Sequence, residues 1–313
     1  MKIPDLAISI NNLTKIYTNE YIKEPKKALD SVSLDIPRGS FFGLLGPNGA
    51  GKSTLINIMA GLVKKTSGSV SIWDHDIEKS ERLSRCAIGV VPQELNLDPF
   101  FTAREILEVQ AGLYGVPKRE RKTNEILQAV NLSDKADVYS RTLSGGMRRR
   151  LLIAKAMVHS PPILVLDEPT AGVDIELRQT LWNSMREMNL KGATILLTTH
   201  YLEEAEELCD QIAIINNGCL VAHDAKESLI KRFDSKSIII VCSESISDIP
   251  QSILRFKPLQ TSSDRLSITY KPSSGVIGEI IAALHESGLK ITDIITEEAD
   301  LNDVFLGLTK GDF

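Results

Sequence analysis

A predicted phosphate-binding loop constrains the fold of this 313-residue chain more than any other stretch of its sequence. Gly46–Ser53 fits the pattern G-x-x-x-x-G-K-S, and it lies between the strand-like run Phe41–Leu45 and the helix-like run Leu55–Ala60. Glycines let the backbone turn tightly, so several N–H groups can point into one anion site beside the positive end of the helix. The order strand, loop, helix therefore predicts an α/β protein that binds nucleotide phosphates.

The residues of this loop have separate expected roles. Lys52 is expected to reach the β- and γ-phosphates, and the hydroxyl of Ser53 is expected to ligate Mg²⁺. The predicted nucleotide-binding residues of the loop are Gly46, Pro47, Asn48, Gly49, Ala50, Gly51, Lys52, Ser53 and Thr54.

Continuous apolar runs later in the chain predict a parallel sheet that is covered on both faces. They are Ile163–Leu166, Ala193–Leu197 and Gln211–Ile215. The segment before them, about residues 96–157, carries apolar residues at helical spacing. The pattern indicates a sheet core with a separate helical part.

Two carboxylates directly follow the first of these apolar runs, and they are Asp167 and Glu168. A carboxylate at the carboxyl end of a strand beside a phosphate loop can hold Mg²⁺. A neighbouring carboxylate can orient a water molecule or accept its proton. We therefore predict that Asp167 is a metal ligand and that Glu168 is a catalytic residue that acts on the water.

A second anion site is predicted at Ser144, Gly145 and Gly146, which begin a helix that continues to Met157. One phosphate loop holds one γ-phosphate, so a second site suggests that a second subunit closes over it. Further polar residues lie at predicted strand ends or in the turns that follow, and they are Gln93, Asp174 and His200.

These motifs together resemble those of the ATPase subunit of an ATP-binding cassette (ABC) transporter. The phosphate loop, Gln93, the Leu-Ser-Gly-Gly stretch, Leu166–Asp174 and Thr198–His200 occur in the order of that family and cover about the first 230 residues. The resemblance implies ATP and Mg²⁺ as cofactors. It also implies the fold, which is a P-loop NTPase cassette with a mixed sheet core and a helical subdomain at about residues 96–157.

The resemblance further implies how ATP is held. Two ATPase subunits would pair head to tail, with each ATP between the Lys52 loop of one and the Ser144–Gly146 stretch of the other. Tyr17 matches the aromatic residue that stacks on adenine. Asp174 would communicate across the dimer seam.

The implied catalytic residues are Glu168, His200 and Gln93. Gln93 would contact Mg²⁺ or the attacking water, so it joins Ser53 and Asp167 as an expected metal ligand. It would also lie near the contact with the membrane subunit. His200 would hold the γ-phosphate and the geometry of Glu168.

One departure from the usual motif indicates a branch of this family. Met147 stands where the signature usually has Gln, as in the ATPases of ABC-2 type exporters, which include drug-resistance, polysaccharide and nodulation-factor exporters. The stretch His200–Asp210 and the ending Ala299–Thr309 also resemble that branch. The resemblance implies an ATP-hydrolysing subunit that powers export through a separate integral-membrane ABC-2 type permease.

The sequence changes character after Phe233, where serines become frequent. Strand-like and helix-like runs alternate there, at Ile238–Cys242, Leu266–Tyr270, Gly275–Ser287, Ile291–Ile295 and Leu301–Leu308. We expect a nucleotide-binding domain at residues 1–233 and a small α/β accessory or regulatory domain at residues 234–313. This second domain is expected to tune assembly and to take no part in catalysis.

Composition narrows the choice of partners. A formal net charge of −5 and an aromatic content of 5% argue against a nucleic-acid partner, because phosphate backbones bind basic surfaces and single strands stack on aromatic residues. No apolar run approaches the roughly 20 residues that span a bilayer. The chain is therefore expected in the cytoplasm, and the resemblance implies that it is bound peripherally to the inner face of the cell membrane.

Two other functions share some of these motifs. A soluble ABC ATPase without a permease, acting in cofactor assembly or on ribosomes or nucleic acid, stays open as an alternative. An inactive regulatory module would lack Lys52, Glu168 or His200, and all three are present. Two intact half-sites favour a homodimer over a pair with a related ATPase. The sequence does not name the cargo or the permease.

Two charged clusters are interpreted as helix faces and are not assigned to the site. The first is Arg148–Arg150, at the start of the predicted signature helix, which is interpreted as a solvated or salt-bridged face, with help in anion binding as the alternative. The second is the set of glutamates after His200, which is interpreted as an exposed helix face and not as a metal site, and its members are Glu203, Glu204, Glu206 and Glu207.

Overall fold

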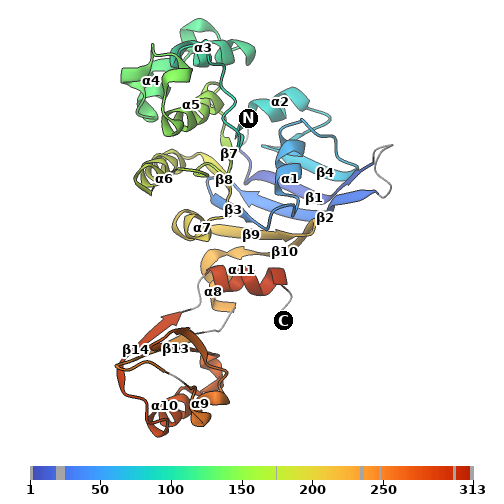
Figure 1. The fold of residues 1–313 in the computed structure, drawn as a ribbon. Helices are drawn as coiled ribbons and strands as arrows, with labels where there is room; N and C mark the ends of the chain where they lie inside the picture. Colours follow the sequence, from blue (N-terminus) through green and yellow to red (C-terminus); the bar gives the residue numbers. More distant parts are fainter. Residues whose placement is uncertain are drawn as a thin grey trace. The chain divides into compact units, whose positions relative to one another are not determined.

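The computed structural model describes residues 3–18, 25–173, 175–232, 236–246, 248–298 and 301–310. The chain divides into two compact units, Met1–Ala225 and Lys226–Phe313. Each unit has a hydrophobic core of its own, and each is described separately below (Figure 1).

A six-stranded sheet forms the centre of the first unit, in the order β10-β9-β3-β8-β7-β6. The strands β9, β3, β8, β7 and β6 run parallel, and β10 pairs antiparallel with β9 at one edge. Their bounds are β3 Phe41–Leu45, β6 Ile88–Val91, β7 Ile163–Asp167, β8 Thr194–Thr198, β9 Gln211–Asn216 and β10 Cys219–Ala225. Every residue of β3 and β8 is buried, so the predicted parallel core is confirmed. The edge strand β10 was not expected.

A second sheet in this unit is antiparallel, in the order β2-β1-β4-β5. Its strands are β1 Leu6–Tyr17, β2 Lys26–Pro37, β4 Ser67–Ile72 and β5 His75–Asp76. Apolar side chains of β1 such as Ile8 and Ile10 are buried, together with Leu55 and Ile58 of helix α1 (Lys52–Met59) and Val165 of β7, in one core cluster. The first two strands therefore belong to a different sheet from β3, which makes the core mixed.

Three helices that contact one another form a helical part, and they are α3 (Ala103–Leu113), α4 (Thr123–Ala129) and α5 (Gly145–Met157). Figure 1 shows them grouped to one side of the two sheets. A capping box of Thr102 and Glu105 starts α3. The other helices of this unit are α2 Glu81–Cys86, α6 Ile175–Leu190 and α7 Leu202–Leu208, with short 3-10 turns at Lys118–Glu120, Ser133–Lys135 and Ser140–Thr142. Within the described ranges, every helix is too short or too polar to cross a bilayer.

The second unit contains an antiparallel sheet in the order β12-β13-β11-β14. Along the chain its elements form a split β-α-β-β-α-β arrangement, made of β11 Lys236–Cys242, α9 Gln251–Leu254, β12 Leu259–Ser262, β13 Arg265–Tyr270, α10 Ile277–Glu286 and β14 Ile291–Glu298. Ile240, Ile268, Ile253 and Ile280 are among the residues buried between the sheet and the helices α9 and α10. The unit also holds α8 (Lys226–Arg232), a 3-10 turn at Pro272–Ser274 and α11 (Leu301–Lys310). The expected small α/β architecture is present, and β12 and α9 were not expected.

Candidate functional site

The phosphate loop connects β3 to α1, and its glycines are required by close contacts. A Cβ atom on Gly46 would lie 2.3 Å from the carbonyl oxygen of Ile215. Gly51 has φ +113°, and a Cβ there would lie 2.6 Å from the carbonyl oxygen of Ala28. No side chain caps α1 at Gly51, so the N–H groups of its first turn are available to an anion.

Lys52 points back into its own loop. Its side chain is buried, with 7% of the residue exposed, and its Nζ donates to the carbonyl oxygens of Gly46 (2.6 Å) and Pro47 (3.2 Å). Burial lowers the pKa of Lys52, while the carboxylates of Glu168 and Asp167 favour its charged form. A cation held in a glycine loop beside two carboxylates is suited to bind a phosphate chain and its metal ion.

Asp167 lies at the carboxyl end of β7, next to Thr198 of β8. The Thr198 hydroxyl donates a hydrogen bond to Asp167 Oδ1, which orients the carboxylate. Burial raises the pKa of Asp167, and the Thr198 hydrogen bond opposes that rise. Ser53, in the first turn of α1, is exposed. The loop and the strand end thus present a hydroxyl and a carboxylate, which are the hard oxygen donors that Mg²⁺ prefers.

Glu168 is the centre of a three-residue cluster. Gln93 Nε2 donates to Glu168 Oε2 at 2.8 Å, and His200 Nδ1 lies 3.2 Å from Glu168 Oε1. These residues follow β6, β7 and β8, which are neighbouring parallel strands, so their carboxyl ends meet at one edge of the sheet. The structure therefore brings together the three predicted catalytic residues. A carboxylate held between an amide and an imidazole can orient a water molecule.

The predicted second anion site lies at the start of α5. Ser144 is the N-cap residue, and its hydroxyl oxygen accepts from the N–H of Met147 at 3.2 Å. Ser144 and Gly145 are exposed, while Gly146 is buried. A Cβ on Gly145 would meet no other atom within 4 Å. This helix start is therefore open to a ligand or partner from outside the chain.

The remaining predicted residues are Tyr17 and Asp174. Tyr17 ends β1 with its ring partly exposed, and the Nζ of Lys15 lies 4.7 Å from the ring centroid. Its role in adenine stacking stays a prediction. Asp174 lies outside the described residues.

The interpretation of Arg148–Arg150 as a solvated or salt-bridged face is wrong for Arg149. Only 3% of Arg149 is exposed. Its guanidinium donates to the carbonyl oxygens of Pro92 (2.9 Å) and Glu168 (3.2 Å). Arg149 therefore contacts the main chain of the candidate site itself.

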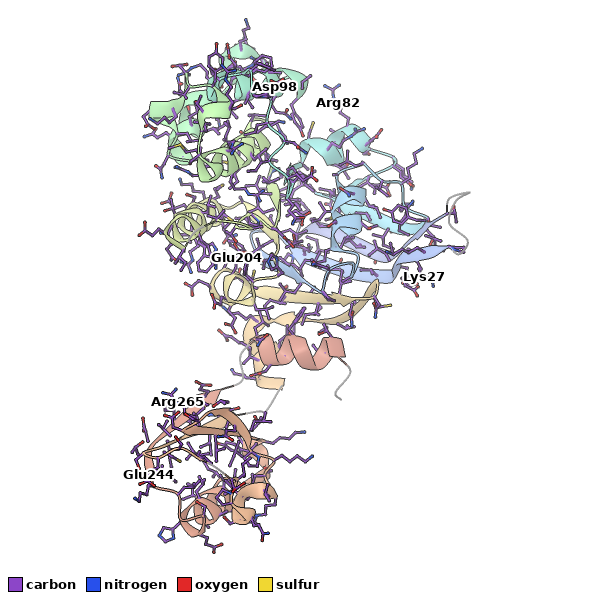
Figure 2. The ribbon with its side chains drawn as sticks, in the orientation of Figure 1. Lys27, Arg82, Asp98, Glu204, Glu244 and Arg265 are labelled. Atoms are coloured by element: carbon purple, nitrogen blue, oxygen red, sulfur yellow. The ribbon has the colours of Figure 1, made fainter. Side chains whose placement is uncertain are left out.

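The interpretation of the acidic stretch after His200 as an exposed face is also wrong for one member. Glu204 is fully buried on α7, the helix next to α6 (Figure 2). Its Oε1 accepts from the Trp182 indole N–H at 2.9 Å and from the Thr170 hydroxyl at 3.0 Å. The carboxyl thus connects α7 to α6 and to the loop that follows Glu168.

The buried carboxyl of Glu204 predicts a specific dependence of stability on pH. Burial raises its pKa above the ordinary glutamate value of 4.5, so above pH 4.5 the unfolded chain loses this proton before the folded chain does. The free energy of unfolding then falls by up to about 1.4 kcal/mol per pH unit until the folded pKa is passed. Glu204→Gln lacks this loss, so its stability relative to wild type should rise between pH 5 and pH 8 in urea unfolding. The exposed Glu203→Gln is the control, and parallel pH profiles for wild type and Glu204→Gln would contradict the prediction.

The fold and the loop geometry define the class of protein, which is a P-loop nucleotide-binding cassette. Comparison with known families agrees, because the ABC transporter family matches residues 29–171. Nod factor export ATP-binding protein I of Bradyrhizobium diazoefficiens is 33% identical over 312 residues, which cover 99% of this chain and 98% of that protein. Linearmycin resistance ATP-binding protein LnrL of Bacillus subtilis is 32% identical, and the match covers 96% of this chain and 98% of that protein.

Solved structures show the same similarity. An ATP-binding subunit of an ABC transporter has a TM-score of 0.64 at 30% identity, over 72% of this chain and 93% of that chain. A dimeric cassette in a post-hydrolysis state, bound to ADP and Pi, has a TM-score of 0.62 at 29% identity, over 70% of this chain and 98% of that chain. This chain belongs to the ATP-binding subunits of the ABC transporter family. It is an ATPase, and ATP is its nucleotide.

Proposed function

We propose that this chain powers an ABC-2 type exporter by hydrolysing ATP at the Glu168 cluster. The observation that carries the proposal is the meeting of Gln93, Glu168 and His200 at the edge of the sheet where the Lys52 loop lies. The relatives named for export and resistance match 96% or more of this chain, whereas the two solved cassettes match 70% and 72%. Similarity to the exporter subunits therefore includes the second unit, and no finding favours an ATPase without a permease.

Each residue of the cluster has a proposed task in hydrolysis. Lys52 and the loop N–H groups bind the phosphates, and Glu168 orients the attacking water and accepts its proton. His200 contacts the γ-phosphate and fixes one oxygen of Glu168. Gln93 fixes the other oxygen, and its position two residues after β6 makes it part of the loop that leads into the helical part.

The donor atoms at this site fit Mg²⁺. Ser53 offers an exposed hydroxyl, and Asp167 offers a carboxylate oxygen that does not accept from Thr198. Gln93 donates its amide N–H to Glu168, which leaves its Oε1 for a metal. We propose these three residues as ligands. Bound Mg²⁺ would neutralise charge on the phosphates. The hydrogen bond from Thr198 would keep the Asp167 carboxylate oriented toward the ion.

The proposed active form is a head-to-tail homodimer. The exposed Ser144 and Gly145 at the start of α5 are available to the ATP bound by a second copy. The dimeric cassette among the similar structures supports this arrangement. ATP would close the dimer because it contacts both copies only in the closed state. Asp174 is proposed to lie at the seam.

The proposed permease contact lies on the segment that follows Gln93. Large apolar side chains are exposed along it and along α3, and they are Leu95, Phe100, Phe101, Val109 and Leu113. Phe100 has 73% of its surface exposed. Several exposed apolar side chains on neighbouring segments are typical of a protein contact, whereas a single one is common on any surface. A permease bound there would hold the chain at the inner face of the cell membrane and would sense movement of Gln93.

The second unit is proposed to be an accessory domain that tunes assembly. Its elements form a separate sheet-and-helix core. The proposed division is residues 1–233 for nucleotide binding, including the helical subdomain at about 96–157, and residues 234–313 for the accessory role. The predicted catalytic and ATP-binding residues all lie in the first of these parts.

Co-purification tests the exporter assignment. The membrane protein encoded beside this gene should be a six-span permease, and it should co-purify with the tagged chain. Phe100→Asp should reduce that recovery by about tenfold or more, because a charge in an apolar contact is unpaired. Leu62→Asp alters an apolar side chain that is 75% exposed just beyond α1, and it should have no effect. A neighbouring gene for a periplasmic binding protein, or equal recovery with both variants, would count against the proposal.

A further inference from the structure

Arg149 connects the helix that starts at Ser144 with the main chain beside both members of the Gln93–Glu168 pair. Its Nη1 donates to the carbonyl oxygen of Pro92 at 2.9 Å, and its Nη2 donates to that of Glu168 at 3.2 Å. Pro92 directly precedes Gln93, whose side chain donates to Glu168. One buried guanidinium is therefore bonded to the main chain that carries Gln93 and Glu168, whose side chains are hydrogen-bonded to each other.

The backbone of Glu168 needs such support because it is strained. Its φ is +48°, in the left-handed region that residues with a Cβ seldom occupy. The N–H of Glu168 donates to the carbonyl oxygen of Thr198 at 3.0 Å, and the Glu168 carbonyl accepts from Arg149. These two bonds hold the main chain on either side of its Cα. They thereby set the direction in which the carboxylate leaves the chain.

The contact uses a property that only arginine offers. A planar guanidinium has a fixed fork of donors that can span two acceptors, whereas a lysine ammonium acts as a single compact point. The neighbouring Arg150 makes the same kind of contact elsewhere, because its Nη1 donates to the carbonyl oxygens of Val130 (3.0 Å) and Asn131 (2.8 Å). Val130 and Asn131 follow α4 in the helical part. Arg150 is thus a matched control in the same helix.

We propose that Arg149 is a positioning residue for ATP hydrolysis, which keeps the Gln93–Glu168 pair aimed at the water by fixing the main chain of Pro92 and Glu168. The inference rests on the proposed role of Glu168 in catalysis. Arg149 is on α5, whose first residues are proposed to contact the ATP of the second copy. The same helix therefore bears on both nucleotide sites of a dimer.

Kinetics on the full chain test this inference. Arg149→Lys keeps the positive charge but cannot span both carbonyl oxygens, so kcat should fall about 10- to 100-fold, as expected when a reacting group is misplaced by about 1 Å. The Kd for a non-hydrolysable ATP analogue should change less than twofold. Arg150→Lys should keep kcat within about twofold of wild type. Arg149→Gln is a second variant, and melting temperatures for all three show whether each protein is folded.

A double-variant cycle separates positioning from general stability. Arg149→Lys added to Glu168→Gln should cost little further activity in single-turnover hydrolysis, because the carboxylate on which Arg149 acts is already gone. The same fold loss in both backgrounds would overturn the inference, as would a normal kcat for both folded Arg149 variants. Normal hydrolysis by Glu168→Gln itself would instead refute the proposed role of Glu168, and with it the basis of the inference.

Discussion

Glu168→Gln is expected to bind ATP and to be almost unable to hydrolyse it. The amide keeps the shape of the side chain but cannot accept a proton from water, and such groups contribute about 100- to 10,000-fold to rate. Because ATP persists, the closed pair of chains should accumulate. Light scattering of Glu168→Gln with ATP and Mg²⁺ should show the mass of a dimer, and without nucleotide that of a monomer.

Two further variants make this expectation specific. Ser144→Arg, added to Glu168→Gln, places a bulky cation at the exposed start of α5 and should return the ATP-bound protein to the monomer mass. Glu203→Gln makes the same chemical change at an exposed position on α7 and should hydrolyse ATP at the wild-type rate. A monomer at every ATP concentration would refute the homodimer and leave the phosphate site untouched.

Lys52→Ala is expected to lose both ATP affinity and hydrolysis. Charge-assisted hydrogen bonds contribute about 1.5–3 kcal/mol each, so the Kd for ATP should rise about 10- to 100-fold. The rate should fall further, because the lysine also stabilises charge that develops on the γ-phosphate. Removing this buried cation also takes away one of the positive charges near Asp167 and Glu168, the other being Arg149. Isothermal titration and a phosphate-release assay measure the two effects.

Lys118→Ala is the control for this change, because Lys118 is exposed in a short turn of the helical part. It should bind and hydrolyse ATP as the wild type does. An ATP affinity for Lys52→Ala within twofold of wild type would show that the loop N–H groups alone hold the nucleotide.

The strands of the parallel core could be predicted from the sequence because fully buried strands leave continuous apolar runs. The strands at sheet edges could not. All four residues of β12 are exposed, so no hydrophobic pattern marks that strand. In β10 exposed residues such as His223 alternate with partly buried ones such as Asp224, and hydropathy alone hides such an edge. Assignment of β1 and β2 to a second sheet depends on long-range pairing that local pattern does not carry.

For the candidate site, motif spacing placed Gln93, Glu168 and His200 at strand ends, and the structure brings their side chains into contact. The sequence did not identify Arg149, although helical geometry contains a signal. Consecutive residues on a helix are about 100° apart, so three arginines in a row cannot share one narrow solvent face. Gly146, Arg149 and Ile153 fall on one side of α5, and all three are buried.

Glu204 was missed for a related reason. A run of glutamates resembles a solvated surface, and the charge of the run conceals its spacing. Glu204 and Leu208 are four residues apart, and both are buried with Ala205 on α7. The two hydrogen-bond donors that make burial of the carboxyl tolerable, Thr170 and Trp182, come from distant parts of the chain. Only the folded structure shows that this carboxyl is buried and accepts two hydrogen bonds.

The separate hydrophobic clusters of the two units have a consequence for cooperativity. A segment that buries its own apolar side chains can lose its structure as an independent block. We therefore expect two unfolding transitions on heating or in denaturant, with a separate midpoint for each block. Bound ATP should raise the midpoint of the block that holds the Lys52 loop, by mass action. The difference between liganded and unliganded melting curves thus assigns each transition to its half of the chain.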